Sequence, residues 1–548
     1  MRVPGSKAVR AASPKTAAVT SAPEAAAPAQ PQAREKKPAT PRRTAAPRKA
    51  RGAEPAAADA PQAGGQPAAS LRILMVTSEA HPFAKTGGLA EVSAALPAAL
   101  ARLGHAVTLV LPRYQGVEAT GDVLGFEFSL GSRAVAGQFV ERRLPEGVRA
   151  VLVDIPEFYD RPGLYGADGV DYPDNAMRFA ALSRAALEYA RLKGERPDII
   201  HAHDWQTGLV PVYQKMHFSN DPVVGRIPVV FTIHNLAFQG VFGAATLDAI
   251  GLGWDVFHPN AMEYWGNISL LKGGVNFSEK ITTVSPTYAR EILTPEFGFG
   301  LEGVLARRAA DLAGIVNGID TERWNPAADP FVPATYSADD LSGKRDAKRA
   351  LLADAGLPSD DAALERPVIG IISRLTDQKG FDLVGAAARE LMELDAAWVM
   401  LGSGERHHED LLRAMAQHHP DRVSATIGFD ERLAHLIEAG ADMFLMPSRF
   451  EPCGLNQLYS LRYGTIPIVR ATGGLEDTVT DAAQPGGNGV KFSDYSPAGL
   501  LAAVRRALDL YRDPVQWQQL QRAAMSVDPS WDVSAREYVK VYGELQNR

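Results

Sequence analysis

Short apolar segments alternate with amphipathic segments from Leu71 to the end of the chain, and this alternation limits the possible folds most strongly. A strand that is apolar throughout is buried on both faces, which happens when helical crossovers cover both sides of a parallel sheet. We expect two series of such strands, the first at 72–77, 106–111, 150–155, 199–203, 229–234 and 280–284, the second at 368–373, 397–401, 423–427, 443–446 and 466–469. The sequence therefore predicts an α/β protein with two domains, separated by a loop-like stretch between residues 320 and 367.

An anion-binding turn is predicted where Lys85-Thr-Gly-Gly-Leu89 joins the first strand to a helix expected from about Leu89 to Leu103. Unpaired amides and the positive end of a helix attract phosphate, and Gly87 and Gly88 let the backbone approach it closely. Gly-Gly also precedes many helices that bind nothing, so this turn alone decides little. It has neither the Walker spacing nor Gly-x-Gly-x-x-Gly, which disfavours ATP hydrolysis and NAD binding.

A second basic pair, Arg374 and Lys379, follows the first strand of the second series. Two cations at the end of a strand can neutralise a diphosphate without a metal; the alternative is an ordinary surface ion pair. Ligands of open α/β sheets bind outside the carboxyl ends of the strands. We therefore expect a diphosphate-bearing ligand in a cleft between the two domains.

Two further turns follow later strands. Glu451, in Arg449-Phe-Glu-Pro-Cys-Gly-Leu455, can bind sugar hydroxyls or stabilise an oxocarbenium-like centre. Thr472-Gly473-Gly474 is a third Gly-Gly helix start and a possible nest of amide donors.

Histidines end two of the expected strands, at His201-Ala-His203-Asp204 and at His234-Asn235. We expect one of the first two histidines to face the cleft while the other packs. Zinc would need a third ligand at suitable spacing, and none is evident, so no metal and no cofactor are predicted. His234 is the stronger candidate for a sugar contact, with a hydrogen-bonded core histidine as the alternative.

The charge of the chain is divided unevenly. Residues 1–70 hold 12 Lys and Arg against 4 Asp and Glu, a net +8, whereas the remainder carries 45 against 60, a net −15. This Ala- and Pro-rich tail cannot bury enough apolar surface to fold, so we expect it to be disordered. It is a solvated extension, a polybasic arm for polyanions or a transit peptide.

A single cysteine, Cys453, excludes an internal disulfide and fits a reducing compartment. No apolar run reaches the roughly 18–20 residues that span a bilayer. The sequence predicts a cytoplasmic protein without membrane contact.

Taken together, the motifs resemble bacterial glycogen synthase and plant starch synthase. The resemblance runs from about Leu71 to the C-terminus and rests on Lys85-Thr-Gly-Gly-Leu, His234-Asn, Ser285-Pro-Thr-Tyr, Asn317-Gly-Ile-Asp, Ser373-Arg-Leu-Thr-Asp-Gln-Lys-Gly, Pro447-Ser-Arg-Phe-Glu-Pro-Cys-Gly-Leu and Thr472-Gly-Gly-Leu. It implies the GT-B glycosyltransferase fold, with Rossmann-like domains at 71–316 and 317–525 and a C-terminal helix at 526–548 that returns to the first domain. It also implies transfer of glucose from ADP-glucose to the nonreducing end of an α-1,4-glucan, with retention at the anomeric carbon.

The resemblance assigns roles to individual residues. Lys85 and Gly88 would bind the diphosphate from one domain, and Arg374 and Lys379 from the other. His234, Asn317 and Glu451 would contact the glucosyl group. The remaining implied contacts to sugar or phosphates are Cys453, Gly454 and Leu455.

Three positions depart from the family pattern. Glu91 stands where Asp is common, Phe429 stands where Tyr often stacks on the nucleotide, and Asn456 stands where many bacterial members have Thr. Phe429 can still stack on adenine but offers no phenolic hydrogen bond.

The tail leads to a first prediction. A protein that begins near Ser70 should keep the melting temperature and specific activity of the full chain, because the first core strand begins at Arg72. Thermal melts and glucan synthesis at saturating substrate measure this. Misfolding of the truncated protein would show that the boundary is placed wrongly.

Overall fold

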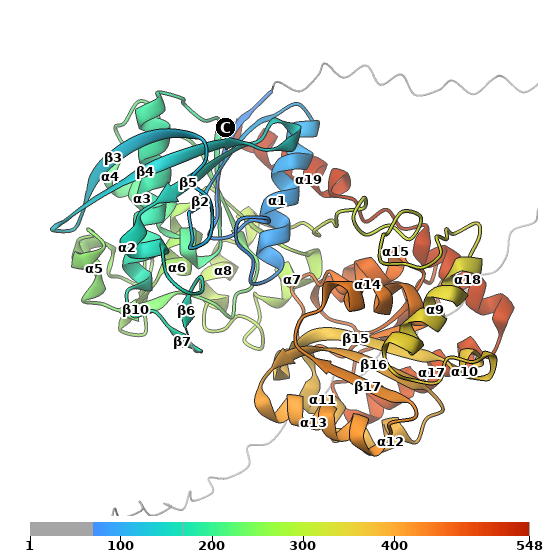
Figure 1. The fold of residues 1–548 in the computed structure, drawn as a ribbon. Coiled ribbons are helices and arrows are strands. Elements are labelled where there is room, and N and C mark those ends of the chain that lie inside the picture. The colour runs from blue at the N-terminus through green and yellow to red at the C-terminus, as the bar shows by residue number, and fades with distance from the viewer. Residues whose placement is uncertain (1–69, 168, 547–548) are drawn as a thin grey trace, which may run out of the picture. The chain divides into compact units, whose positions relative to one another are not determined.

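The computed structural model describes residues 70–167 and 169–546. The tail predicted for residues 1–70 therefore lies outside the described residues, apart from Ser70. The described chain forms two lobes, each built on one large sheet (Figure 1). Within these residues, every helix is too short or too polar to span a lipid bilayer.

The N-terminal lobe contains a nine-stranded sheet in the order β14-β13-β9-β8-β1-β2-β5-β4-β3. Seven strands run parallel, and they are β1 Arg72–Val76, β2 Ala106–Pro112, β5 Arg149–Asp154, β8 Ile199–His203, β9 Val229–Ile233, β13 Lys280–Thr283 and β14 Leu312–Gly314. Its longer helices are α1 Gly88–Arg102, α3 Asn175–Lys193, α4 Leu209–His217 and α6 Leu270–Phe277, with the shorter α7 Pro286–Glu291 and α8 Glu302–Arg307. The expected apolar strands of the first series are all present.

An antiparallel hairpin, β3 Asp122–Leu130 and β4 Arg133–Arg143, closes one edge of this sheet and was not expected from the sequence. Phe126, Phe128 and Leu130 are buried while the residues between them are exposed. That alternation with a period of two is the signature of a strand covered on one face. A search for continuous apolar runs alone cannot detect it.

The C-terminal lobe has a six-stranded parallel sheet in the order β17-β16-β15-β18-β19-β20. The strands are β15 Val368–Leu375, β16 Ala397–Gly404, β17 Val423–Ile427, β18 Met443–Met446, β19 Ile466–Arg470 and β20 Val490–Phe492. Numbered along the chain within this lobe, the order is 3-2-1-4-5-6, the Rossmann arrangement. All strands of the second series are confirmed, and β20 is additional.

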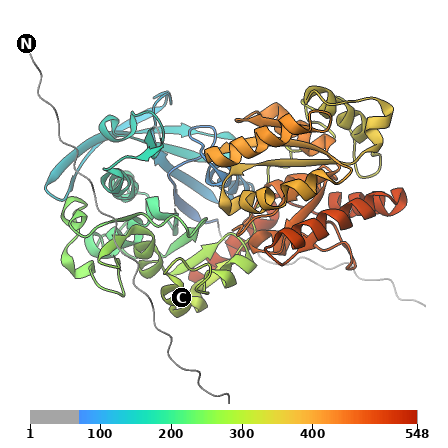
Figure 2. The same ribbon diagram turned by 90° about the horizontal axis from the view of Figure 1, so that it is seen from below.

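Helices cover both faces of the C-terminal sheet (Figure 2), as its alternating core side chains require. Ile369, Ile371 and Met400 belong to one buried cluster, and Val368 and Val399 belong to the other. The helices of this lobe are α9 Ser342–Asp354, α10 Asp361–Glu365, α11 Phe381–Ala386, α12 Ala388–Met392, α13 Arg406–His418, α14 Glu431–Gly440, α15 Asn456–Arg462, α16 Gly473–Thr478, α17 Pro497–Tyr511 and α18 Pro514–Met525.

The last helix, α19 Trp531–Gln546, packs beside α1 of the N-terminal lobe. Trp531, Tyr538 and Tyr542 join the buried cluster that contains Ile73 and Met75 of β1. The end of the chain thus completes the core of the first lobe. The domain limits at residues 71, 317 and 526 stay predictions.

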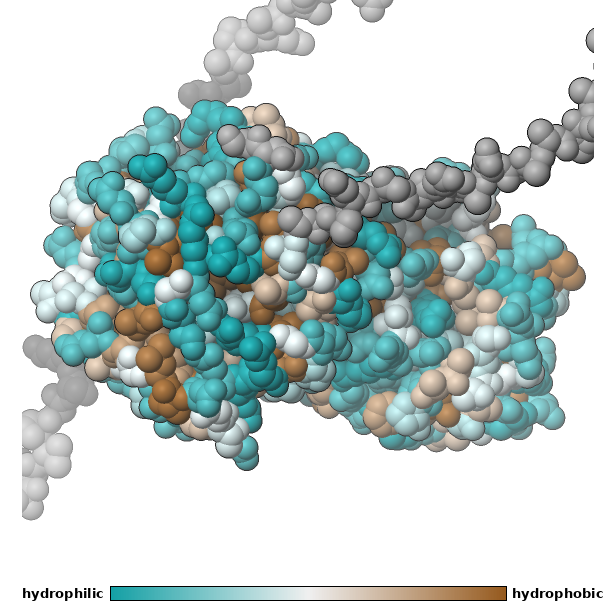
Figure 3. All heavy atoms as spheres, turned by 90° about the horizontal axis from the view of Figure 1, so that it is seen from above, coloured by the Kyte–Doolittle hydropathy of each residue, from teal (hydrophilic) through white to brown (hydrophobic). Residues whose placement is uncertain are grey.

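One face of the molecule is mainly hydrophilic (Figure 3), as expected when apolar side chains lie in the core. On the face shown in Figure 3, hydrophilic residues predominate and hydrophobic ones form small, separate groups. Most large apolar side chains of the described residues are instead inside the two lobes.

Candidate active site

A cleft of about 930 Å³ lies between the two sheets. In each lobe it opens where the strand order reverses, between β1 and β8 and between β15 and β18. Glu79 follows β1, Asp204 follows β8, Arg374 is the second-last residue of β15 and Ser448 follows β18, and all four line the cleft. Such reversal points are where open α/β sheets bind ligands.

The structure brings most of the predicted site residues to this cleft. Its lining includes Gly87, Gly88, His234, Asn317, Arg374, Lys379, Phe429, Glu451, Cys453, Gly454 and Leu455. Five predicted residues are absent from the lining, namely Lys85, Glu91, Thr472, Gly473 and Gly474. The chemical roles of all these residues stay predictions.

The two C-terminal cations are held differently. Lys379 Nζ donates to Glu451 Oε2 at 2.6 Å, and Ser448 Oγ donates to the same oxygen at 3.0 Å. The Arg374 side chain is exposed and has no partner among the described residues. The cleft therefore presents one guanidinium ready for an anion and one ammonium that is already paired.

Gly380 explains how Lys379 reaches Glu451. Its φ is +81°, and any Cβ at this position would collide with the carbonyl oxygen of Pro447. The short helical turn η5, Asp377–Lys379, can therefore pack against the loop after β18 only because a glycine follows it. Arg449 N–H donates to Gln378 O across the same contact, at 2.9 Å.

The Gly-Gly turn before α1 is held by a buried acid that the sequence analysis did not single out. Glu79 accepts hydrogen bonds from Thr86 Oγ1 at 2.9 Å and from Tyr165 OH at 2.7 Å. Lys85, by contrast, pairs with Glu91 at 2.5 Å outside the cleft lining. In this conformation Glu91 neutralises the cation that the sequence assigned to the diphosphate.

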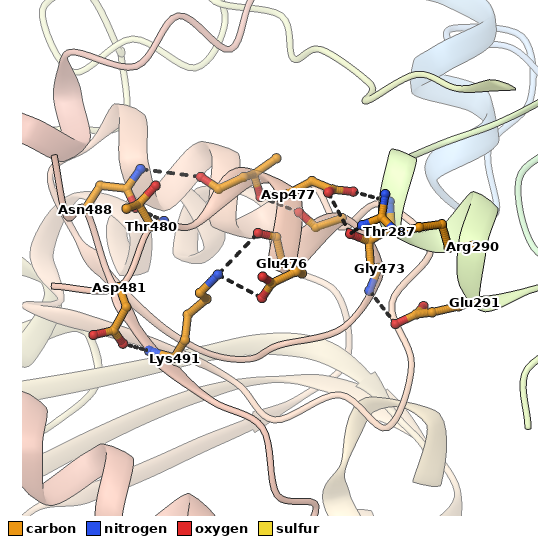
Figure 4. Close-up of polar contacts among 12 residues, drawn as sticks. Thr287, Arg290, Glu291, Gly473, Glu476, Asp477, Thr480, Asp481, Asn488 and Lys491 are labelled. Atoms are coloured by element: carbon orange, nitrogen blue, oxygen red, sulfur yellow. Dashed lines mark hydrogen bonds and ion pairs between the residues drawn. The ribbon is translucent and has the colours of Figure 1, made fainter. Parts of the chain in front are cut away.

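The third Gly-Gly turn contacts the other lobe instead of the cleft (Figure 4). Glu291 of α7 accepts from Thr472 Oγ1 at 2.9 Å and from Gly473 N–H at 3.0 Å. A Cβ at Gly473 would collide with Glu451 O, and one at Gly474 with Cys453 O. These glycines therefore let the helix α16 support the turn that carries Glu451, and a carboxylate of the protein fills the donor nest.

A second cross-lobe contact lies beside the first (Figure 4). Thr287 donates through its amide and its hydroxyl to the Asp477 carboxylate, both at 2.7 Å. Ser285 Oγ donates to Pro452 O at 2.6 Å. The start of α7 is thus bonded directly to the turn after Glu451.

The histidines form a chain that leads from the partly buried His234 in the cleft to the buried His203 and His201. His234 Nε2 lies 3.0 Å from His203 Nδ1, and His201 Nδ1 lies 2.8 Å from Tyr542 OH of α19. Burial lowers the pKa of His201 and of His234 to about 3, and that of His203 well below its usual value. All three rings are therefore neutral near pH 7.

One expectation about these histidines is wrong. His201 and His203 lie on the same face of β8, with ring centroids 4.2 Å apart, and neither lines the cleft. Side chains two residues apart on a strand point the same way, so the two could not face opposite sides. His234 alone reaches the cleft.

Asp204 is a further cleft residue for which the sequence analysis assigned no role. Its Oδ1 accepts a hydrogen bond from the backbone N–H of His234 at 2.7 Å, and its own φ is +58°. Burial raises the pKa of this carboxyl to about 7, partly offset by hydrogen bonds from the backbone of His234 and Asn235. Its position directly after an apolar strand was the available signal.

Asn317 and Cys453 line another part of the cleft. Asn317 is buried, and its Oδ1 has no hydrogen-bond partner among the described residues. Burial raises the pKa of the Cys453 thiol to about 12. The thiol therefore stays protonated and is a poor nucleophile.

Within the described residues, one group of side chains could hold a metal ion. It consists of Asp377, His407 and His408, with His408 Nε2 3.0 Å from Asp377 Oδ1. His201 and His203 do not belong to this group. Asp377 is the first residue of η5, and all three residues lie outside the cleft lining. The absence of a metal requirement stays a prediction.

Comparison with known proteins identifies relatives of both lobes. Residues 72–307 match the family model of the starch synthase catalytic domain, and residues 358–523 match that of glycosyl transferases group 1. The glycogen synthase of Anaeromyxobacter dehalogenans (strain 2CP-1 / ATCC BAA-258) is 49% identical over 478 residues, which cover 87% of this chain and 99% of that protein. The glycogen synthase of Myxococcus xanthus (strain DK1622) is 47% identical over 483 residues, 87% of this chain and 99% of that protein.

A solved structure is similar over the same part of the chain. The catalytic domain of starch synthase IV from Arabidopsis thaliana, bound to ADP and acarbose, has a TM-score of 0.80 and 36% identity, and covers 87% of this chain and all of that one. Sucrose-phosphate synthase from Thermosynechococcus elongatus, at 17% identity and a TM-score of 0.55, shares the fold alone. The predicted GT-B fold is confirmed.

The neutral histidines predict how stability depends on pH. A histidine whose folded pKa lies below 6.5 binds fewer protons than the unfolded chain between the two values, so stability falls as pH drops from about 6.5 towards 3. Replacing His201→Gln should flatten the decline of the free energy of unfolding between pH 7 and pH 5, by up to about 1.4 kcal/mol per pH unit.

Denaturant titrations at several pH values measure this slope. Asp204, with its raised pKa, acts in the opposite direction, but it is present in both proteins and cancels in the comparison. His418→Gln, at an exposed histidine of α13, is the matched control and should leave the slope unchanged. Equal slopes for the parent and His201→Gln would contradict the buried neutral histidine.

Proposed function

This chain belongs to the glycogen synthase and starch synthase family of glycosyltransferases, and we propose that it transfers glucose from ADP-glucose to the nonreducing end of an α-1,4-glucan in glycogen biosynthesis, with retention at the anomeric carbon. The observation that carries this proposal is the placement of Arg374 and the Lys379–Glu451 pair opposite Gly87 and Gly88 in one cleft. Cations and free amides suit a diphosphate, while a carboxylate among them suits the hydroxyls of a sugar.

The leaving diphosphate gains negative charge as the glycosidic bond breaks. Arg374, Lys379 and the amides of Gly87 and Gly88 stabilise that charge most in the transition state, which is the condition for catalysis. Before the donor binds, Lys379 is paired with Glu451. Donor binding therefore replaces the Glu451 carboxylate with the diphosphate as the anionic partner of Lys379. We expect no divalent ion to be needed.

The sugar is held between the lobes. His234 presents a neutral imidazole. Asn317 Oδ1, which has no hydrogen-bond partner among the described residues, can accept a hydrogen bond from a sugar hydroxyl. The buried Cys453 thiol is protonated and gives no covalent nucleophile. We therefore favour attack by the acceptor hydroxyl on the face that the leaving phosphate occupies.

The nucleotide base has an exposed aromatic partner. Phe429 follows Gly428 at the rim of the cleft, and 80% of its surface is accessible. Its ring can stack on adenine. The ADP bound to the starch synthase IV structure supports an adenine nucleotide here.

Two other functions remain as alternatives: a retaining transferase that uses another nucleotide sugar, and an inert glucan-binding scaffold. The experiment is radiolabelled glucose transfer into glycogen from ADP-glucose and, separately, from UDP-glucose. Incorporation from ADP-glucose supports the proposal. Incorporation from UDP-glucose alone overturns the donor, and none from either overturns catalysis.

The cellular setting follows from the same proposal. We place the reaction in the cytoplasm, where the free thiol of Cys453 would stay reduced. Contact of the basic tail with polyanions stays a prediction.

Removing either cleft cation should impair catalysis more than folding. Arg374→Ala and Lys379→Ala should each lower turnover at least about 100-fold, since a charge-stabilising donor contributes roughly 3–4 kcal/mol to the transition state. Steady-state kinetics and thermal melts measure both effects. The control is Arg389→Ala, which should change neither, because the exposed Arg389 side chain pairs among the described residues with Glu393 alone. Near-normal turnover and an unchanged melting temperature in either variant would show that the replaced cation does not stabilise the leaving diphosphate.

A further inference from the structure

Trp265 is the most exposed large hydrophobic residue of the described chain, with 81% of its surface accessible. Its φ is +51°, in the left-handed region that residues other than glycine rarely adopt. Four described non-glycine residues have a positive φ: Glu146, Asp204, Trp265 and Phe299. Such outliers gather at ligand sites, and Asp204 already lines the cleft.

The strain arises from a tight turn. Trp265 and Gly266 join β11, Glu263–Tyr264, to β12, Asn267–Ser269, and both have a positive φ, as in a type I′ turn. Asn-Gly is the sequence that this turn prefers. Tryptophan here is strained and unburied at the same time, so neither turn geometry nor core packing accounts for it.

The hairpin is joined to the wall of the cleft. Gln239, which lines the cleft, donates through Nε2 to Phe299 O at 2.9 Å, and Tyr264 OH donates to the same oxygen at 2.8 Å. A Cβ placed on Gly300 would lie 3.5 Å from Trp265 Nε1. Trp265 therefore lies next to the Phe299–Gly300 segment, and the hydrogen bond from Gln239 joins that segment to the cleft lining.

Aromatic rings continue from this segment in both directions. The rings of Phe299 and Phe450, from different lobes, are 5.5 Å apart, and Phe238 lines the cleft with 53% of its surface accessible. The polar groups around the Trp265 turn carry both signs of charge, because Lys272 Nζ donates to Glu263 O. Glu263 Oε1 accepts from Gly266 N–H, and Asn267 is the next residue along the hairpin.

We propose that Trp265 and Phe299 form a platform for the acceptor glucan, outside the cleft and beyond the sugar that accepts glucose. The proposal rests on the proposed function and extends it to the binding of long chains. A glucose ring has an apolar C–H face and hydroxyls around its edge, so it can stack on an indole while amide and carboxylate groups bind the hydroxyls. Both signs of charge lie near the turn, and a neutral glucan requires no excess of either.

The platform should separate long acceptors from short ones. A trisaccharide held inside the cleft would not reach Trp265, whereas a glycogen chain would pass over it. Loss of the indole should therefore raise KM for glycogen and leave kcat, and KM for maltotriose, unchanged.

The test uses Trp265→Asn, which restores the residue that the turn prefers. This variant should melt about 1–2 °C higher than the parent, because the strain is relieved. It should also bind glycogen about three- to tenfold more weakly in gels that contain glycogen but no donor. A merely structural residue would not gain stability and lose binding together. Trp254→Ala, at another exposed tryptophan, is the matched control and should bind like the parent.

Two results would overturn the platform: equal glycogen binding by Trp265→Asn and the parent, or an equal loss in Trp254→Ala. The gel assay needs no turnover. Failure of the parent to transfer glucose would therefore count against the proposed function, whereas the binding comparison would still judge the platform.

Discussion

The buried carboxylate of Glu451 is the constraint on which the site depends. A buried anion is costly unless it is paired and hydrogen-bonded, and here Lys379 and Ser448 supply both. This pairing fixes η5 against the loop after β18, and Gly380 makes the close approach possible. The same pairing leaves Arg374 as the cation of this group with no protein partner among the described residues.

The turn that carries Glu451 is also the point where the two lobes meet. Gly473 and Gly474 support it from α16, and Ser285 of the N-terminal lobe donates to Pro452 O. Glu291 completes the contact by occupying the amides of the third Gly-Gly turn. Movement of one lobe against the other would thus act directly on Glu451, the residue that we propose contacts the sugar, and closure of such a cleft excludes water from the donor.

The continuous apolar runs allowed the parallel strands, and hence both sheets, to be predicted from the sequence, because burial on both faces leaves a local signature. The hairpin of β3 and β4 was not predicted, because its sequence signature is an alternation of buried and exposed side chains. Pairings between distant residues also escaped: nothing local shows that Glu91 neutralises Lys85, that Glu291 fills the nest at Gly473, or that Glu79 holds the first turn. Position after a strand located the cleft, while charge pairing within it required the structure.

The most direct measurement is the affinity of ADP for Glu451→Gln by isothermal titration calorimetry, with turnover measured in parallel. ADP lacks the glucosyl group, so its binding loses no contact when Glu451 is replaced, and Lys379 is released from its competing anion. We expect Glu451→Gln to bind ADP about three- to tenfold more tightly while glucose transfer falls sharply. Unchanged or weaker ADP binding would contradict the exchange of Lys379 between Glu451 and the diphosphate.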